Sequence, residues 1–519
     1  MARNGNKRGA VPVPKMVATI GLGFLVGSSN AFSAGADDST VQLSGAGNDN
    51  YFKLGGYVRT WASWNLKDHP ETPQDDKGSL QMLRGSLSLN ADAKTGPLLW
   101  KAIVRSDQEK LTNYEKHLQD QVRAGTPGGP GSDMIEEYRR TELREFYVDA
   151  DVGERVHLRL GKQQVVWGET DFFHPTDLIQ GYDFRWRSFL EPESDELRKP
   201  LIIANATIDF PEADGSMQLI LRPGLDRKKD IGNNYQLSGG RWMAQPFKGV
   251  DFLSGITTYD REHPAGDYQD VTGGLRWTGI AGSYSYAVSA LNTFYPDAVL
   301  NPAANPYRKA PEGALGDWIY PRVTVIDASV STEIPAIDAV VNAEVAYQRD
   351  RVFNTGSRLS TPGIGPVIKK DVITTTVRVD KQLKTMDLLG TNQASFFSVQ
   401  LFDTYIKDFD SSDDIVLQIG YGAPAKKHDT ILTAFITLNY MNSRLNPGLA
   451  VGQNLSTGDA FAIPSISYSY GDNWRFLAEL DMFFPKNQKR SAAQVERSTY
   501  PLADLANNNQ FMLRATYQF

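Results

Sequence analysis

The chain ends in Phe511-Met512-Leu513-Arg514-Ala515-Thr516-Tyr517-Gln518-Phe519, and this stretch is the most informative one for the fold. Every second residue counted from Phe511 is apolar, whereas the residues between them are mostly polar. Alternation with a period of two places the two sets on opposite faces of a β-strand. An edge strand of a soluble sheet would alternate in the same way, so the rest of the chain has to decide between a soluble and a membrane sheet.

The beginning of the chain has the pattern of a secretory signal peptide. Four basic residues precede a short apolar stretch, Met16 to Gly27, and small residues follow it. This stretch is shorter than the roughly 20 residues that a helix needs to cross a bilayer. We therefore expect residues 1–36 to be a signal peptide cleaved after Ala31 or Ala36. Residues 37–50 are then a short periplasmic segment, and residues 51–519 form the mature domain.

The composition excludes several classes of protein. The chain has no cysteine, which excludes a disulfide framework and a lipid-anchored cysteine. Its mean hydropathy is −0.38 and it lacks a long apolar run, which excludes a helical membrane protein. Removing the four basic leader residues lowers the formal net charge from −7 to −11, which argues against nucleic acid as a partner.

Segments of about ten residues alternate between apolar and polar positions throughout the mature chain. In Leu98 to Asp107, the apolar face holds Trp100 and Val104, and the other face holds Lys101 and Arg105. A soluble sandwich would leave such a charged face in water, whereas a membrane barrel turns it toward the lumen. We therefore predict that a set of charged residues lines a lumen: Arg84, Lys101, Arg105, Arg144, Arg159, Glu344 and Arg378.

Connections of two lengths separate these segments. Short turns such as Lys94–Pro97 alternate with long polar connections such as Gln108–Arg140, Gly168–Pro200 and Ser443–Ala460. Membrane barrels keep short turns on the periplasmic side and long loops outside. The sequence therefore predicts an all-β fold, a closed antiparallel transmembrane β-barrel of about 18 strands, within a range of 16 to 20. One or more of its long extracellular loops are candidates for folding into the lumen.

Two details of this prediction stay open. Short turns and long loops alternate when counted from either end of the chain, but the two counts disagree by one strand between about residues 224 and 265. Either a weak strand lies within Asp226–Lys248, or one apparent strand is not in the wall. The connection Gln108–Arg140 contains a run of glycine and proline that no regular element tolerates. It is either a mobile outside loop or a second segment folded into the pore.

The terminal strand is similar to the last strand of outer-membrane β-barrels. Its closing Phe resembles the signal that their insertion machinery reads, so Tyr517 and Phe519 are the predicted membrane-assembly signal. The resemblance implies a location in the outer membrane of a Gram-negative bacterium. The expected partners are outer-membrane lipid and lipopolysaccharide, the barrel-assembly machinery and a small-molecule substrate.

One block of sequence resembles a particular family. The run from Gly161 to Glu169, Gly-Lys-Gln-Gln-Val-Val-Trp-Gly-Glu, is similar to the proteobacterial outer-membrane family known as domain of unknown function 1302. Leu54–Arg59, Arg222–Asp226 and Trp318–Pro321 extend the resemblance over most of the mature chain. It implies a large porin-like barrel. Transport of hydrophobic compounds, together with an inner-membrane exporter, is suspected for the family, which has no assigned catalytic residues.

The same block predicts a constriction of the lumen. Rigid aromatic and acidic residues follow directly after a strand: Trp167, Glu169, Asp171, Phe172 and Phe173. The aromatic rings would supply apolar contact, and the two carboxylates would pair with arginines of the lumen. The alternative is an aromatic residue of the membrane interface followed by an ordinary surface loop.

The motifs of common enzymes are missing from the sequence. It contains no H-E-x-x-H, no G-x-S-x-G and no phosphate-binding loop. His174 with Asp171 and Asp177 is the one candidate cluster for an outer-membrane hydrolase, and Lys407–Asp414 is an acidic loop that could hold calcium. We expect no catalytic residue, no metal and no cofactor. The expected function is a channel for a small amphipathic or hydrophobic molecule; the alternatives are a component of an export system or a hydrolase.

Overall fold

The computed structural model describes residues 41–44, 50–125, 133–168, 170, 173, 176–188, 191, 194–243, 248–256, 270–417, 423–486 and 502–519. The expected signal peptide, Glu169, Asp171, Phe172 and His174 lie outside these residues.

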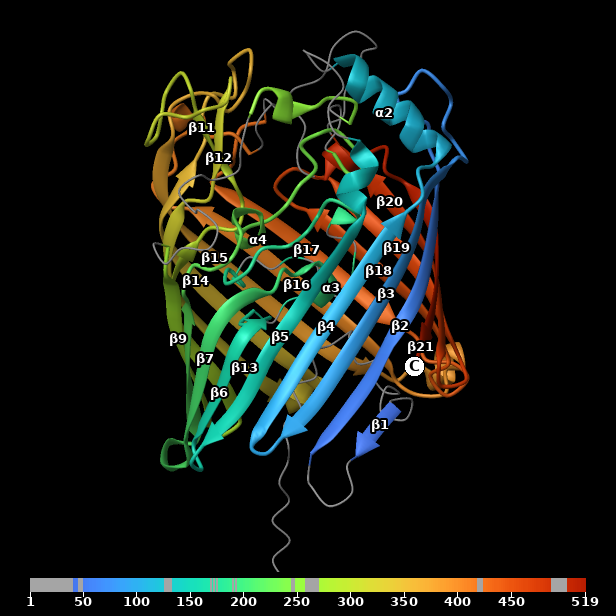
Figure 1. The fold of residues 1–519 in the computed structure, drawn as a ribbon, viewed down its shortest axis with the longest axis vertical. Coiled ribbons are helices and arrows are strands. Elements are labelled where there is room, and N and C mark those ends of the chain that lie inside the picture. Colours follow the sequence, from blue (N-terminus) through green and yellow to red (C-terminus); the bar gives the residue numbers. More distant parts are fainter. Residues whose placement is uncertain are drawn as a thin grey trace, which may run out of the picture.

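Eighteen antiparallel strands form one closed wall (Figure 1). Each strand pairs with the next along the wall, and the last pairs with the first through contacts such as Thr60 with Ala515. The prediction of a closed antiparallel barrel of about 18 strands is confirmed. The wall strands are β2 (Tyr51–Asn65), β3 (Leu80–Thr95), β4 (Leu98–Glu109), β5 (Arg140–Val152), β6 (Val156–Gln163), β7 (Leu201–Phe210), β8 (Gly215–Arg222), β9 (Thr272–Ala281), β10 (Tyr284–Phe294), β13 (Arg322–Ile334), β14 (Ala339–Phe353), β15 (Ile368–Leu383), β16 (Ser395–Ile406), β17 (His428–Thr437), β18 (Leu445–Asn454), β19 (Ala460–Tyr470), β20 (Trp474–Phe484) and β21 (Gln510–Gln518).

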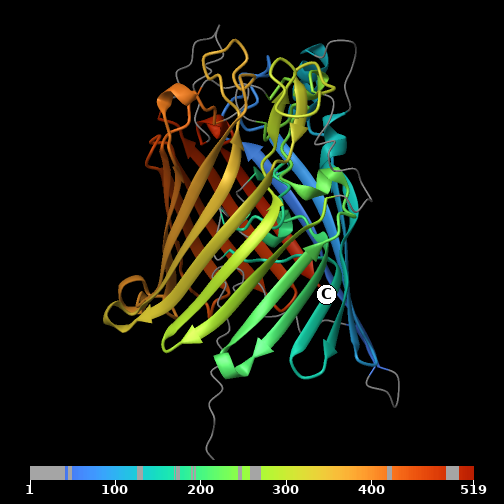
Figure 2. The ribbon, with the colours of Figure 1, turned by 90° about the vertical axis from the view of Figure 1, so that its left-hand side faces the viewer.

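The remaining elements lie outside the wall ladder. Strand β1 (Val41–Ser44) pairs with the start of β2, below the end of β21, and β11 (Val299–Pro302) pairs with β12 (Gly316–Ile319) in a separate hairpin. Long loops gather at one end of the barrel and short turns at the other (Figure 2). The helices are α2 (Asn113–Gly125), α3 (Ser194–Leu197), α4 (Lys228–Ile231) and α5 (Met386–Leu389), with 3₁₀ turns η1 (Met134–Tyr138), η3 (Pro211–Ala213), η4 (Phe252–Ser254), η5 (Pro335–Ile337), η6 (Ser411–Asp413) and η7 (Ala503–Leu505). Among the described helices, none is long and apolar enough to cross a membrane.

The two faces of the wall differ in chemistry. On the terminal strand, Leu513 and Tyr517 are exposed on the outside, whereas Arg514 and Thr516 are buried inside. The same alternation continues around the barrel and leaves a belt of exposed apolar side chains: Val58, Leu87, Val104, Phe146, Leu160, Leu219, Leu275, Val288, Ile326, Val345, Leu401, Leu432, Leu449 and Ile466. A contiguous apolar surface of this extent marks contact with lipid or with another protein.

The sequence-based prediction is wrong at β18. The sequence predicts a long loop over Ser443–Ala460, but ten of these residues form a wall strand that pairs with β17 and β19. Two glycines and a proline weaken the alternation there. Gly452 is required by packing, because a Cβ at this position would lie 2.2 Å from the ring of Phe461. Leu449 still faces outward.

The open question between residues 224 and 265 is answered in part. The described residues of Asp226–Lys248 contain helix α4 and no strand, so the weak wall strand considered for that segment is not seen in them. The hairpin of β11 and β12 is paired, but it stands in a loop outside the wall.

The faces of β4 lead to a prediction about assembly. Val104 is exposed outside and Arg105 is buried inside, so Ala102 faces outward and Ile103 inward. An arginine near the bilayer midplane costs about 2–4 kcal/mol on the lipid face. We expect Ala102→Arg to reduce the heat-modifiable, folded fraction on a gel far more than Ile103→Arg does. Equal tolerance at the two positions would contradict the assigned faces.

Candidate functional site

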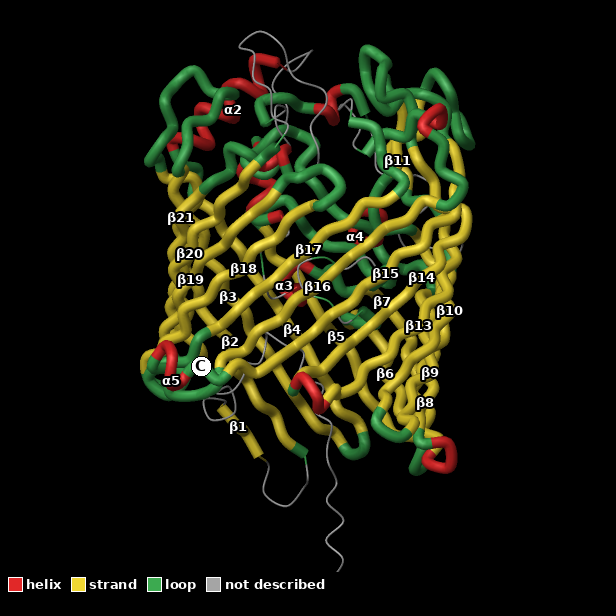
Figure 3. Tube along the Cα trace, turned by 180° about the vertical axis from the view of Figure 1, so that it is seen from behind, coloured by secondary structure: helices red, strands yellow, loops and turns green. Residues whose placement is uncertain are grey.

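Two long loops fold back into the barrel and form what we call the lumen insert: the described residues of 164–200 and of 226–256. Its helices α3 and α4 lie within the outline of the barrel in opposite views (Figures 1 and 3). The prediction that long loops fold into the lumen is therefore confirmed. The first loop contains Trp167 and Phe173 of the predicted constriction; Glu169, Asp171 and Phe172 cannot be placed because they lie outside the described residues.

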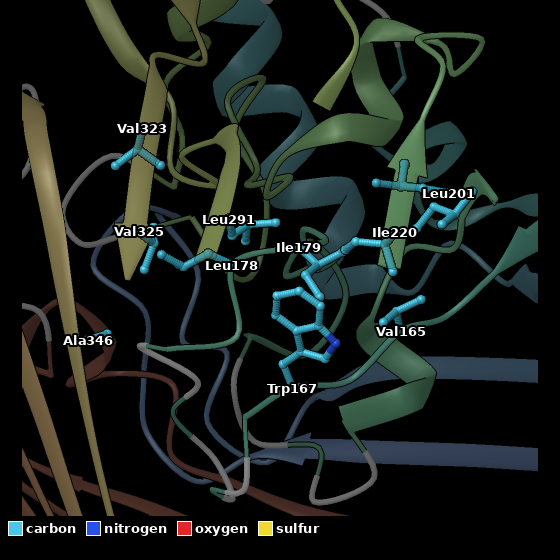
Figure 4. Close-up of a cluster of buried hydrophobic side chains, with 11 residues drawn as sticks. Val165, Trp167, Leu178, Ile179, Leu201, Ile220, Leu291, Val323, Val325 and Ala346 are labelled. Carbon is cyan, nitrogen blue, oxygen red and sulfur yellow. The ribbon is translucent and has the colours of Figure 1, made fainter. Parts of the chain in front are cut away.

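Trp167 anchors one side of the insert on the wall. Its ring is 5% exposed and lies in an apolar cluster with inward residues of β7, β8, β10, β13 and β14 (Figure 4). Its indole Nε1 donates a hydrogen bond to Gln218 Oε1 at 2.8 Å. Gly274 makes the close approach possible, since a Cβ there would lie 3.0 Å from the indole ring. The alternative of a membrane-interface aromatic is thus wrong for Trp167.

Phe173 reaches the other side of the lumen. Its ring centroid lies 5.6 Å from that of Phe402 on β16 and 6.5 Å from that of Phe461 on β19. Strand β19 stands nine strands from β8 around the 18-strand wall, which is half the circumference. The first loop of the insert therefore spans the barrel from wall to wall.

Buried ion pairs hold a third side of the insert. Arg187 pairs with Glu479 on β20, and Glu191 lies 3.1 Å from Arg514 on β21. Glu196 pairs with Arg59 on β2 and Arg105 on β4. All these side chains are less than a tenth exposed. The rings of Trp61 on β2 and Trp186 in the insert pack edge to face among these arginines, with centroids 5.4 Å apart.

Isolated backbone bridges connect parts of the first loop of the insert and join it to the second loop. Tyr182 bridges to Arg198, and Asp183 bridges to Asn234 of the second loop. Phe184 N donates to Asn234 O at 2.9 Å, and Asn234 N donates to Tyr182 O at 2.8 Å. The backbones come very close at one point, because a Cβ on Gly181 would lie 2.2 Å from the carbonyl carbon of Gly232. Together these contacts make the insert one folded body.

The second loop ties the insert to helix α2 at the mouth. Arg241 is fully buried, and its Nη1 lies 2.5 Å from Glu109 Oε2 and 2.7 Å from Glu115 Oε1. Helix α2 buries Tyr114 and Leu118 against its surroundings at the long-loop end of the barrel (Figure 1). The described part of Gln108–Arg140 is therefore packed against the insert at the rim of the mouth and is not a free outside loop.

The predicted lumen charges separate into three groups. Arg84, Arg105 and Arg144 lie at the insert: Arg84 and Arg105 pair with Asp107, and Arg144 donates to the carbonyls of Asp195 and Arg198. Two further residues pair within the wall near the short-turn end, Lys101 with Asp92 and Arg159 with Asp149. The last two are on other strands, Glu344 on β14 and Arg378 on β15 beside Asp380.

The sequence did not single out the residues that connect the insert to the wall. Arg187, Glu191, Glu196 and Arg241 stand in segments that looked like charged loops. The one local signal was the density of aromatic and charged residues in Tyr182–Arg187, which is unusual for a solvated loop.

The acidic loop Lys407–Asp414 is held by Lys370, whose Nζ lies 2.7 Å from Asp413. The described residues contain no group of three or more side chains placed to hold a metal ion.

Glu115 gives the site a pH dependence. Burial, the largest cause, raises the pKa of Glu115 from its ordinary 4.5 to about 7; Arg241 opposes this shift and Glu109 adds to it. A carboxyl whose pKa is raised on folding contributes stability below its unfolded pKa, and this contribution is lost as the pH rises through about 7. Glu115→Gln should flatten the dependence of the unfolding temperature on pH between 4.5 and 7. An unchanged pH profile would contradict the assignment.

The chain is similar to a protein family and to several solved structures. Residues 15–214 match the family described as "Protein of unknown function (DUF1302)", which confirms the resemblance over this part of the chain. No curated protein matches it significantly. Pseudomonas aeruginosa OpdK, solved with vanillate, is 9% identical with a TM-score of 0.42, over 90% of this chain and 98% of that one. Acinetobacter baumannii OccAB3 is 10% identical with a TM-score of 0.44, over 90% and 99%.

Proposed function

We propose that this protein is a porin-like channel in the outer membrane of a Gram-negative bacterium, and that a small amphipathic or hydrophobic molecule passes through its lumen beside the insert. The observation that carries the proposal is a closed wall with an apolar exterior and a charged interior. Lipid covers such a belt in transmembrane barrels, whose closed walls leave no free sheet edge. By the rule for bacterial barrels, the short turns face the periplasm and the long loops face the outside.

The chemistry of the insert supports an amphipathic substrate. Trp167 and Phe173 place aromatic rings on two sides of the lumen, next to apolar wall residues. The arginines named at the third side are paired with carboxylates, so that region has charge of both signs and no field of one sign. Binding sites for small molecules are mostly apolar with a few placed polar groups, and the contact region between the insert and the wall has that composition.

A hydrophobic dye tests this function in cells. The intact outer membrane excludes N-phenyl-1-naphthylamine, whose fluorescence rises when it enters the cell envelope. We expect cells that produce the protein to take up the dye faster than cells with an empty vector. Purified protein should also give discrete conductance steps in planar bilayers. Folded, heat-modifiable protein that produces neither effect, both as wild type and with the insert loosened by Trp167→Ala, would refute the channel.

A further inference from the structure

The carboxylate of Glu196 sits in a clamp of two wall arginines. Its Oε1 lies 2.5 Å from Arg59 Nη1 on β2, and its Oε2 lies 3.1 Å from Arg105 Nη1 on β4. Guanidinium groups match the planar geometry of a carboxylate and hold it by charge-assisted hydrogen bonds. The carboxylate comes from helix α3 of the insert, whereas both arginines come from the wall.

Wall residues position both arginines independently of the insert. Arg59 Nε donates to Thr516 Oγ1 of β21 at 3.0 Å. Arg105 Nε donates to Asp107, its neighbour on the same face of β4, at 3.1 Å. Each guanidinium is thus oriented through its Nε and directs an Nη toward Glu196. The clamp would therefore keep its shape if α3 moved away.

Aromatic rings surround the clamp. The guanidinium of Arg59 lies 4.4 Å from the centroid of the Tyr57 ring and 5.2 Å from that of Trp61. The guanidinium of Arg105 lies 6.0 Å from the ring of Trp186. A molecule whose carboxylate took the place of Glu196 would find apolar ring surface for its body. A ligand that fits both the arginines and the rings has a carboxylate and an apolar body, and is therefore amphipathic.

We infer that Glu196 is an internal ligand, which occupies a carboxylate-binding site that the carboxylate of the permeating molecule takes during passage. The inference rests on the proposed channel and names its substrate class, an amphipathic carboxylate. The carboxylate of the ligand competes with Glu196 for Arg59 and Arg105. When it displaces Glu196, α3 loses its attachment to β2 and β4, and the insert no longer blocks the lumen at this side. A purely structural anchor would hold the insert in the same place but would not exchange with a ligand.

Binding of benzoate to the purified full-length protein tests the exchange, with benzyl alcohol as the uncharged analogue. Glu196→Gln keeps the shape of the side chain but removes its charge, so the clamp loses its competitor. Hydrogen bonds to charged groups correspond to about ten- to hundredfold in affinity. We expect Glu196→Gln to bind benzoate at least about tenfold more tightly than wild type, with no change for benzyl alcohol. Adding Arg59→Gln should abolish this gain.

The stability of the same variant is a second readout. Glu196→Gln removes the carboxylate that Arg59 and Arg105 share and leaves Arg105 its pair with Asp107, so it should unfold at a lower temperature than wild type. Benzoate should restore the unfolding temperature and benzyl alcohol should not. The matched control is Glu212→Gln, which removes a carboxylate from an exposed pair with Arg155 at the short-turn end. This control should leave both the stability and benzoate binding as in wild type.

The outcomes separate the two proposals. Equal effects of benzoate and benzyl alcohol, or benzoate binding that is unchanged or weaker in Glu196→Gln, would overturn the internal ligand. If the protein conducts and admits the hydrophobic dye but shows no benzoate exchange, the channel stands and the carboxylate site is refuted. If benzoate exchanges but no variant conducts or admits the dye, the site stands and the channel is refuted.

Discussion

Replacing Arg241 by methionine is expected to destabilise the protein by about 3–5 kcal/mol, the usual cost of removing one partner from a buried ion pair. Arg241 is fully buried between Glu109 and Glu115, and methionine fills similar space without the charge. Glu109 keeps Arg84 at 2.8 Å, whereas Glu115 loses its arginine. Helix α2 would thereby lose its ion pair with the insert. Unfolding of detergent-solubilised protein in urea, together with proteolysis of α2, measures the effect.

The matched control for Arg241→Met is Arg155→Met. Arg155 pairs with Glu212 at an exposed turn, and such a surface pair contributes about 0–1 kcal/mol. Lowering the pH from 7.5 to 5 should reduce the loss in Arg241→Met, because Glu115 then carries a proton. If both variants lose equally little stability, the buried triad does not hold α2.

Trp167→Ala should have the second large effect. A buried tryptophan replaced by alanine costs about 3–5 kcal/mol, from lost apolar contact and from the cavity that remains. Here the cavity would open between the insert and the inward faces of β8, β10 and β13, and the hydrogen bond to Gln218 would be lost. We expect a lower unfolding temperature and larger, noisier conductance steps in planar bilayers.

Trp474→Ala is the control for Trp167→Ala. Trp474 lies on the outside at the short-turn end and contacts Phe476 and Tyr517. Its loss changes the same residue type without touching the lumen, so the conductance should stay at the wild-type value. Conductance that also stays at that value in a folded Trp167→Ala variant would show that this anchor does not shape the passage.

The wall was predictable from the sequence because its signal is local. Leu513 and Arg514 face opposite sides simply as neighbours in an extended strand. The prediction failed at β18. Gly452 leaves room for the ring of Phe461 on the next strand, and this glycine weakens the alternation of polar and apolar residues. Tertiary packing decided that position, and a single strand read alone cannot show it.

The interior of the barrel was predictable only in outline. The aromatic residues after β6 indicated an inward segment, and the structure places Trp167 and Phe173 inside. The sequence alone could not predict which wall residues pair with the insert. Arg187 and Glu479 are 292 positions apart, and no spacing rule connects residues at that distance. Glu191 and Glu196 pair with wall arginines, and the sequence did not single them out. The pairing predicted for Glu169 and Asp171 stays a prediction, because both lie outside the described residues.

The attachment of the insert on both sides of the closing seam has a consequence for folding kinetics. The seam joins residues as far apart as Arg59 and Thr516, 457 positions, so closing it alone has a high entropic cost. The insert bonds to β2 through Glu196 and to β21 through Glu191. Once it is docked, the first and last strands are already neighbours and the remaining search is short. During unfolding, the insert still connects β2 and β21 after the hydrogen bonds between them break. The two strands can therefore pair again before they separate. The insert therefore slows unfolding as well as speeding closure. Its loss should raise the unfolding rate and lower the folding rate, so that the free energy of unfolding falls by the sum of the two effects.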